Sequence, residues 1–416
     1  MTEPGEEGLV RALCAAVAAY DAETAGALVA DGADPDRALP DGTTPLLRAV
    51  EGGSPAVVAA LNDARPAWGL PQGERERLLD AARRWYAAGP EAELRRLTGA
   101  RGPARTEVVQ DGECGRVEEV TLGGRTVRGG HGAVLTGLEW GMRIPAPVGE
   151  LVARAVGHPD EEHVDRSECL WVLLRRQSAQ TWSEVAAFHR HPSPAHRAFA
   201  AEFLSAGLLL SGVTAHVSWY EKERAGLLAG WADTEPEGGV LARVLRLLSD
   251  DAHPDAQAFG LRYAAHPDPR VRREVPGLLD RPLDPGAARV VVDLARDRDG
   301  GVRARAAERL GGGEGLGARE RAALLGLLRD EDPQVRDRAL RAAAYDRSPE
   351  TAEALLELLG AGEREVRLGA AYALAVRDHP GTAEAYERVG PLGPEYADDP
   401  RAAGLWRWRL RNEPGG

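Results

Sequence analysis

The clearest pattern along the chain is a run of apolar positions spaced by four residues in its C-terminal third. Side chains at this spacing share one face of an α-helix, so each segment predicts a helix with a single buried stripe. Four segments carry the stripe: Val271, Val275 and Leu279; Val302, Ala306 and Leu310; Val335, Ala339 and Ala343; and Val366, Ala370 and Leu374. Leucine clusters precede two of these segments, so the chain predicts helices that repeat in pairs.

The same helices open with a recurring ten-residue phrase. It reads HPDPRVRREV from His266, DRDGGVRARA from Asp297, DEDPQVRDRA from Asp330 and AGEREVRLGA from Ala361, and the Val-Arg pairs are 31, 33 and 31 residues apart. A period in this range is typical of a solenoid, in which each unit packs only on its neighbours. The phrase resembles HEAT repeats, whose second helix opens with Asp-Pro-x-Val-Arg. The resemblance covers residues 253–378 and, more weakly, 147–252.

A different pattern occupies residues 1–100. From Gly32 to Pro66 the chain reads GADPDRALPDGTTPLLRAVEGGSPAVVAALNDARP. Thr44 can cap a helix whose first position is Pro45, where no amide hydrogen is needed. Gly52-Gly53 allows the chain to reverse before a second helix. The segment resembles an ankyrin repeat, with degenerate helix pairs on both sides of it.

Residues 101–146 predict strands. β-Branched and polar residues alternate over 106–109, 117–122 and 125–128, and Asp111-Gly112 and Gly123-Gly124 are turn signals between them. An isolated ribbon is only marginally stable, so we expect this small antiparallel ribbon to pack on a helical neighbour.

The predicted fold is therefore mainly α. It consists of an ankyrin-like helical array (residues 1–100), a β ribbon or connector (101–146) and a HEAT-like α-solenoid with a C-terminal capping helix (147–416). The run Trp406-Arg407-Trp408-Arg409 falls in the predicted cap, with tryptophan inward and arginine outward. A docking patch is the alternative for this run, because tryptophan and arginine are frequent anchors of interfaces.

Composition narrows the class of protein. The 416 residues carry a net charge of −13, so the chain lacks the broad positive field with which nucleic acid is usually bound. Lys222 is the only lysine among 52 basic residues, which favours a bacterial, high-GC source. The three cysteines, Cys14, Cys114 and Cys169, suggest neither a disulfide framework nor a zinc pattern. An acidic N-terminus and short apolar runs predict a cytoplasmic protein without membrane contact.

One set of polar residues belongs to the repeat itself. The resemblance to HEAT repeats implies hydrogen bonds between neighbouring turns, made by the arginine after each motif valine and by the turn acids. We call this set the ladder: Asp268, Arg272, Asp299, Arg303, Asp332, Arg336 and Arg367. A row of arginines that binds phosphate or carboxylate is the alternative, but charge-assisted pairs within the turns favour a structural role.

A second set is a candidate binding surface. Positions three and six beyond each motif valine lie off the buried stripe and vary in type. We call them the second-helix face: Glu274, Gly277, Arg305, Glu308, Arg338, Arg341, Gly369 and Tyr372. We expect this face to line the concave side of the solenoid and to bind a partner. The turn of the ankyrin-like segment is a second candidate, which we call the 37–43 turn: Arg37, Leu39, Asp41 and Thr43.

The remaining chemical motifs favour structural explanations. Five histidines precede proline, which disfavours helix at the residue before it, and so predict turns between helices: His158, His191, His253, His266 and His379. A denser group lacks a nearby acid or cysteine to complete a metal site: His189, His191 and His196. The glycines of 123–132 lack the lysine of a phosphate-binding loop. We expect no metal, no cofactor and no catalytic residue.

The predicted function is a non-enzymatic scaffold or adaptor that binds one or more proteins, and two repeat types suit engagement at two points. The alternative is nucleic-acid binding, because some DNA glycosylases are built from HEAT-like repeats; the residues available for it are Trp182, Trp219, Trp231 and Arg305. Some bilin lyases also carry HEAT-like repeats, but Cys114 and Cys169 give that role no specific support. The sequence leaves the partner and the oligomeric state open.

Overall fold

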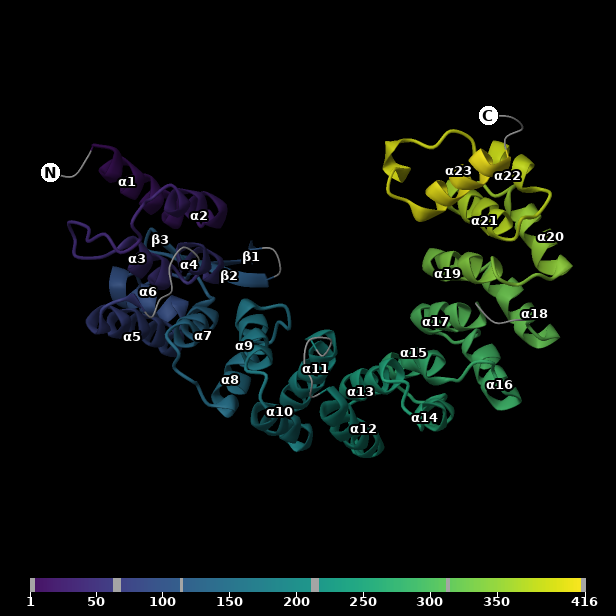
Figure 1. Cartoon of the computed structure of the whole chain (residues 1–416), viewed down its shortest axis with the longest axis horizontal. Coiled ribbons are helices and arrows are strands. Elements are labelled where there is room, and N and C mark those ends of the chain that lie inside the picture. Colours follow the sequence, from purple (N-terminus) through teal and green to yellow (C-terminus); the bar gives the residue numbers. More distant parts are fainter. Residues whose placement is uncertain (1–3, 63–68, 113–114, 211–216, 312–314, 413–416) are drawn as a thin grey trace. The chain divides into compact units, whose positions relative to one another are not determined.

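The computed structural model describes residues 4–62, 69–112, 115–210, 217–311 and 315–412, with the side chains of residues 4–5, 208–210 and 217–221 outside the description. Cys114 and the side chain of Trp219 therefore lie outside the described residues. The chain is mainly helical with one small antiparallel sheet, which confirms the predicted fold class (Figure 1). It forms two compact units, residues 1–211 and 212–416. No described helix is long and apolar enough to cross a membrane.

The first unit contains eleven described α-helices and the three strands. The helices are α1 (Pro4–Ala18), α2 (Ala22–Ala30), α3 (Pro45–Gly52), α4 (Pro55–Asn62), α5 (Gln72–Ala88), α6 (Pro90–Thr98), α7 (His131–Gly141), α8 (Val148–Ala155), α9 (Val164–Arg175), α10 (Ala179–Ala186) and α11 (Pro194–Leu210), with the 3₁₀ turn η2 (Ala187–Arg190) after α10. The strands are β1 (Arg105–Asp111), β2 (Gly115–Leu122) and β3 (Arg125–Arg128).

Helix α3 begins and ends as its sequence predicts. Thr44 accepts a hydrogen bond from the Leu47 amide at 3.1 Å, and Pro45 occupies the first turn. Gly53 ends the helix with φ +72°, a conformation in which glycine avoids the clash of a Cβ. A Cβ at Gly53 would also lie 2.1 Å from the Arg128 carbonyl oxygen, so this glycine lets the end of β3 approach α3.

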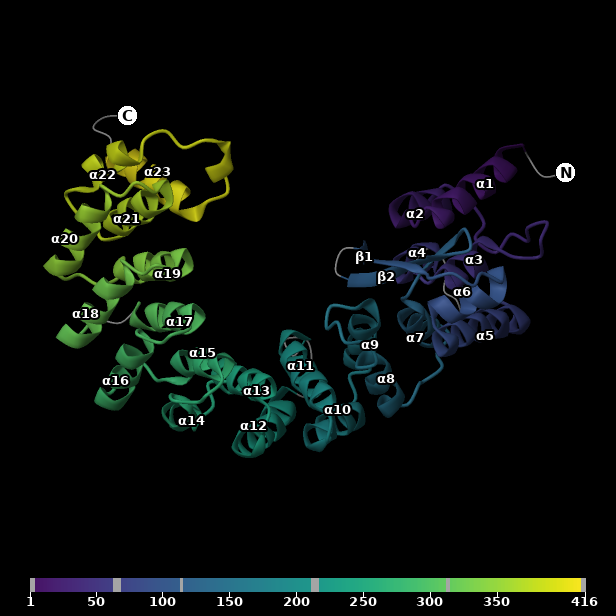
Figure 2. The same cartoon turned by 180° about the vertical axis from the view of Figure 1, so that it is seen from behind.

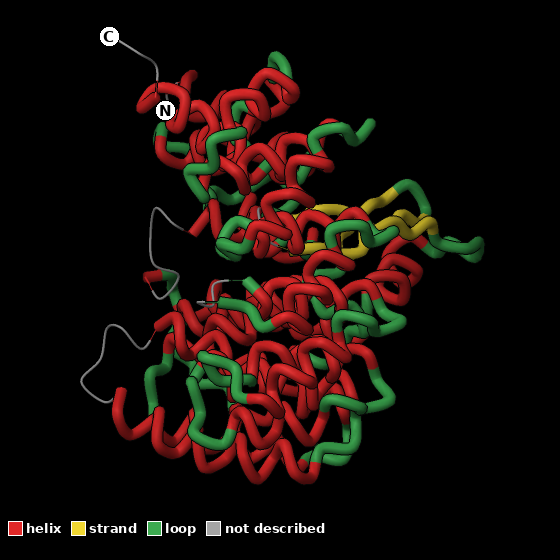
Figure 3. Tube along the Cα trace, turned by 90° about the vertical axis from the view of Figure 1, so that its right-hand side faces the viewer, coloured by secondary structure: helices red, strands yellow, loops and turns green. Residues whose placement is uncertain are grey.

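The sheet has the order β1-β2-β3 with antiparallel neighbours. Figure 3 shows its strands in yellow. Gly123 and Gly124 form the β2–β3 turn, both with positive φ, which is the two-residue turn that matches strand twist. Val120, Leu122 and Val127 pack against Trp85 and Leu94 of α5 and α6. The ribbon therefore packs on helices, as predicted from the marginal stability of an isolated ribbon.

The second unit is a series of helices joined by short turns. They are α12 (Val217–Thr234), α13 (Gly238–Asp250), α14 (Ala256–Tyr263), α15 (Pro269–Leu278), α16 (Pro285–Leu294), α17 (Gly300–Leu310), α18 (Ala318–Leu327), α19 (Pro333–Ala343), α20 (Pro349–Leu358), α21 (Arg364–Val376), α22 (Thr382–Val389) and α23 (Pro400–Asn412), with the 3₁₀ turn η4 (Pro394–Tyr396) before α23. Within this unit α15, α17, α19 and α21 follow one another on the inner side of its curve (Figure 1). Helices α14, α16, α18 and α20 form the outer row (Figure 2).

The predicted stripes form the core between the two rows. Val275, Val302, Ala306, Val335 and Ala339 are fully buried. An acid caps the first turn of three of these helices. The side chains of Asp268, Asp299 and Asp332 accept hydrogen bonds from backbone N–H groups two or three residues later in the chain. Proline or glycine follows each acid, so the motif both starts the helix and sets its stripe. Glu363 makes no such bond at the start of α21.

Helix α23 lies against α21 at the end of the array. Leu405 is buried and Trp408 packs against the core, but the Trp406 side chain is 58% exposed. The expectation of inward tryptophans therefore holds for Trp408 and is wrong for Trp406. Residues 405 and 408 are three apart and share one helix face, which turns residue 406 outward.

Candidate functional site

The second-helix face lies on α15, α17, α19 and α21, and its charges form ion pairs between successive helices. Glu274 on α15 accepts from Arg246 of α13 at 2.8 Å and lies 3.9 Å from Arg305 of α17. Arg305 also binds Glu308 at 2.8 Å, and Glu308 binds Arg338 of α19 at 3.0 Å. Positive and negative groups thus alternate across four helices.

A second chain of pairs continues on α19 and reaches the end of the array. Asp337 of α19 accepts from Arg341 at 2.8 Å and from Arg401 of α23 at 3.2 Å. Arg401 also binds Glu365 of α21 at 2.6 Å. Next to these pairs, the Tyr372 ring packs against Gly404, where a Cβ would lie 2.5 Å from the ring. Tyr372 therefore holds α23 on α21.

The face is only partly available to a partner. Glu274 is buried, whereas the side chains of Arg305, Arg338 and Arg341 are 42%, 49% and 46% exposed. Surface ion pairs of this kind contribute about 0–1 kcal/mol each, so they do not hold the arginines firmly. The exposed part of this face is therefore a row of arginine guanidinium groups whose positive charge is largely balanced by neighbouring acids.

The ladder arginines lie in the turns beside this face. Each donates through Nη1 to the backbone carbonyl six residues earlier, which closes its own turn, and three also reach an acid of the next turn. The cross-turn pairs are Arg272–Asp297, Arg303–Asp330 and Arg336–Glu363. Two of the three paired acids, Asp297 and Asp330, are the first residues of their phrases, and the third, Glu363, is the third residue of its phrase. Asp268, Asp299 and Asp332 cap helices, and Asp299 also pairs between turns, with Arg273 at 2.9 Å.

The histidine of every His-Pro turn caps its own turn, and so does the aspartate that takes its place at the first position of the recurring phrase. The Nδ1 atom of each histidine accepts the backbone N–H two residues on, at 3.0–3.2 Å: His158, His191, His253, His266 and His379. Asp297 and Asp330 accept the same N–H through Oδ1 at 2.9 Å. Histidine and aspartate are therefore interchangeable turn caps here. At His191 the likeness extends to Arg197, which donates to the His191 carbonyl six residues earlier at 2.9 Å.

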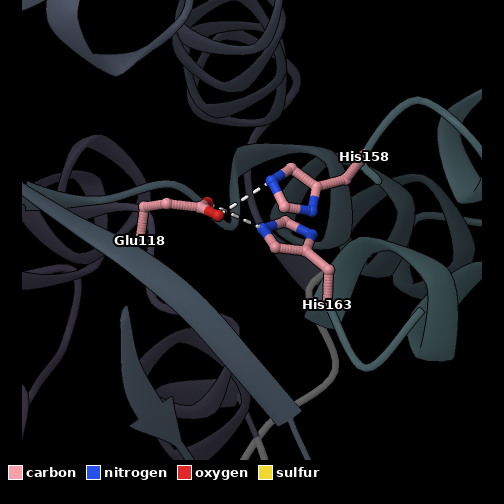
Figure 4. A group of neighbouring side chains, drawn as sticks. All are labelled: Glu118, His158 and His163. Carbon is pink, nitrogen blue, oxygen red and sulfur yellow. Dashed lines mark ion pairs between the residues drawn. The ribbon is translucent and has the colours of Figure 1, made fainter. Parts of the chain in front are cut away.

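Glu118, His158 and His163 form the group that most resembles a metal site among the described residues (Figure 4). Glu118 belongs to β2, His158 to the turn after α8, and His163 caps α9. The Glu118 carboxylate lies 2.8 Å from Nε2 of His158 and 3.3 Å from Nε2 of His163, the latter off the line of a good hydrogen bond. Burial lowers the pKa of His163, and the neighbouring His158 lowers it further.

The orientation of both rings does not fit a shared metal ion. Each Nδ1 accepts a backbone N–H, from Asp160 and Asp165, so the ring proton is on Nε2, the atom nearer to Glu118. A ring nitrogen binds a metal along its own plane, but these rings are stacked at 4.2 Å and differ by only 24° in orientation. An ion would have to turn both rings away from their turns. The group is instead a hydrogen-bond clamp between the sheet and the α8–α9 turn.

Asp165 is a buried carboxyl group beside this clamp. Its Oδ1 atom accepts the Ala133 amide at 2.6 Å, at the start of α7. Burial raises the pKa of Asp165 to about 7, against the effect of the Ala133 hydrogen bond. A Cβ on Gly132 would lie 2.3 Å from the carboxylate, so glycine is needed for this close packing. The contacts are those of a structural group that joins α7 to α9.

The 37–43 turn is held together by its own side chains. Asp41 accepts from the Thr43 amide at 3.0 Å and from Arg48 at 2.8 Å. The Leu39 amide donates to the Thr43 carbonyl at 2.8 Å, and Arg37 lies 3.7 Å from Glu6 of α1. The Thr43 and Arg48 hydrogen bonds lower the pKa of Asp41 to about 2. The turn is thus ordered and exposed.

Comparison with known proteins finds a family similarity in one part of the second unit. Residues 321–389 match the family described as HEAT repeats. This segment is therefore similar to HEAT repeats. No match was found among curated protein sequences. Among solved structures, the chain is similar to the Escherichia coli protein YibA, at 15% identity and a TM-score of 0.46, over 63% of this chain and 93% of that one.

Sequence reasoning did not identify the ion-pair partners of the predicted residues. Asp297 and Asp330 had a signal, because both open the repeated phrase and align with His266. Arg246 and Arg401 had none, since they come from helices outside the clear repeats.

Proposed function

We propose that the protein is a non-enzymatic scaffold in the cytoplasm and that the second-helix face of its HEAT array binds another protein. One observation carries the proposal: Arg305, Arg338 and Arg341 present exposed guanidinium groups from adjacent, regularly spaced helices. Repeat arrays bind partners through such varied positions on a constant frame. Arginine is also enriched in protein interfaces.

The balance of charge favours a protein partner over nucleic acid. A polyanion requires cations that are free to replace its counterions. Glu274, Glu308 and Asp337 already form ion pairs with Arg305, Arg338 and Arg341 of this face. Trp231, one of the aromatic residues considered for nucleic-acid binding, is buried and donates to Glu235 at 2.8 Å.

The 37–43 turn is a second binding surface in this proposal. Residues 32–66 act in it as an ankyrin-like repeat, and support comes from the Thr44 cap, Pro45 in the first turn and the left-handed Gly53. The exposed loop between such repeats is held by Asp41 and Thr43. Two surfaces in one chain allow a scaffold to hold its partners together.

Affinity capture of the tagged full chain from an extract of its source cells, with and without nuclease, tests the proposal. We expect a stoichiometric protein that survives nuclease and is lost with Arg338→Glu/Arg341→Glu. The matched control is Arg289→Glu/Arg319→Glu, which makes the same charge change at exposed arginines of α16 and α18. Equal recovery with both double variants, or loss of every protein on nuclease treatment, would contradict it.

A further inference from the structure

The outward surface of α23 combines exposed apolar and cationic side chains. Trp406 and Leu410 are 58% and 52% exposed. They are four residues apart and so lie side by side on the helix. Their helix is anchored on its other side by Leu405 and Gly404, so the exposure is not that of a loosely packed segment. Large exposed apolar groups at a fixed helix face are typical of an interaction surface.

The charges of α23 differ from those of the HEAT array. The helix contains Arg401, Arg407, Arg409 and Arg411 and no acid. Arg401 is paired with acids of α19 and α21, but neither Arg407 nor Arg411 forms an ion pair with any residue that the structure describes. Arg409 lies over the Tyr386 ring, 4.7 Å from its centroid. In a chain of net charge −13, this is a local cationic surface.

A cleft lies beside this surface, between α22, the loop that follows it and the start of α23. Its volume is about 790 Å³, within the range of ligand-sized sites. Its lining includes Tyr386, Leu392, Tyr396, Trp406 and Arg409, with Glu387 as an acid on the α22 side. Tyr396 is fixed by a hydrogen bond to Glu365 at 2.7 Å. Tyrosine, tryptophan and arginine are the residues most enriched in interface hot spots.

We infer that this α23 surface docks an acidic segment of a protein partner, with an apolar side chain of that segment seated in the cleft against Trp406. The inference rests on the proposed scaffold function and adds a second site with a partner of stated chemistry. Carboxylates of the partner would pair with Arg407 and Arg411, whose charges no described acid balances. An anionic membrane or nucleic acid would need a wider cationic field than one helix of an acidic chain provides.

A library of random 16-residue peptides displayed on phage, selected against the immobilised full chain, tests the inference. We expect the selected peptides to be enriched in Asp and Glu next to Leu, Phe or Trp. We expect them to bind Trp406→Ala and Arg407→Glu/Arg411→Glu at least about tenfold more weakly than wild type. Binding should weaken as salt rises, because the pairs are exposed. Arg289→Glu/Arg319→Glu, with an equal charge change elsewhere in the unit, should bind like wild type.

The outcomes separate this inference from the proposed function. Peptides that lose binding only with Arg338→Glu/Arg341→Glu would overturn the α23 site and leave the second-helix face in place. Peptides without acid enrichment, or unaffected by the α23 variants, would overturn the inference. Preferential binding of the chain to anionic vesicles or duplex DNA, lost with Arg407→Glu/Arg411→Glu, would replace the protein partner with that class of ligand. The exposure of all the substituted side chains makes unchanged circular dichroism the expected control result.

Discussion

Removal of an acid that pairs with a ladder arginine provides the sharpest test of how the helical repeats of the second unit are held together. Asp330 accepts from Nε and Nη2 of Arg303 at 2.7 and 2.8 Å, and its Oδ1 also accepts the Asp332 amide. The two side chains are 13% and 10% exposed. Asp330→Ala would leave the Arg303 guanidinium largely buried, with the Asp297 carbonyl as its one remaining hydrogen-bond acceptor.

The expected cost follows from these contacts. Loss of one partner of a buried ion pair costs about 3–5 kcal/mol, because the other charge stays behind. Arg303 keeps one carbonyl partner and some contact with water, which favours the lower end, about 3 kcal/mol. Since about 1.4 kcal/mol is a factor of ten, the local opening equilibrium between α17 and α19 should rise about 150-fold.

Hydrogen exchange measured by mass spectrometry reports this opening locally, which suits a repeat array whose unfolding need not be two-state. We expect faster exchange in α17 and α19 with Asp330→Ala, and partial recovery when Arg303→Met and Asp330→Leu are combined. Glu353→Gln is the control, because Glu353 is exposed on α20 and makes no ion pair with any described residue. Exchange within threefold of wild type would refute the reasoning.

The same pair has a defined pH dependence. Burial alone would raise the pKa of Asp330, but hydrogen bonds from Arg303 and the Asp332 amide outweigh it and hold the pKa below its usual value. The contribution of the Arg303–Asp330 pair to stability is therefore present above the unfolded pKa of about 4 and is lost as the pH falls below it. Protection of α17 and α19 should fall on acidification in wild type and change less with Asp330→Ala.

Three further predictions concern the first unit. Gly53→Ala should destabilise it by more than about 3 kcal/mol in urea denaturation, because its Cβ meets the Arg128 carbonyl; Gly99→Ala, also at positive φ but in open space, should cost only about 1 kcal/mol. Burial raises the pKa of Asp165 to about 7, so the stability of this unit should fall as the pH rises from about 4 to 7. A pH series with Asp165→Asn should lack this fall, and an unchanged slope of unfolding free energy against pH would contradict the prediction. Glu118→Gln should lower the free energy of unfolding by about 1–2 kcal/mol and leave zinc binding, measured by calorimetry, equal to wild type. A loss of zinc affinity with this variant would show that the group is a metal site.

Sequence reasoning located the repeated helices well, because their signals are local. The apolar spacing of Val302, Ala306 and Leu310 sets a stripe, and the Asp332-Pro333 pair sets a helix start. The turn of Gly123 and Gly124 likewise requires only backbone conformations that glycine adopts freely. Such features depend on a few adjacent residues and not on residues that are distant in the sequence.

The partners of the candidate residues depend on distant helices, and this is where sequence reasoning stopped. Arg401 is 64 residues from Asp337, and nothing in either sequence context marks the pair. The exposure of Trp406 was missed for a different reason. The choice of which tryptophan faces inward depends on how α23 packs against Tyr372 of α21, which no local pattern specifies.

Binding of a protein to the second-helix face is the main prediction for this chain. A photoreactive amino acid at position 338 of the full chain, activated in an extract of the source cells, tests it most directly, with the same group at position 353 on the outer row as the control. We expect position 338 to cross-link to one protein and Arg341→Glu to suppress the product. Cross-links to nucleic acid, or the same products from both positions, would contradict it.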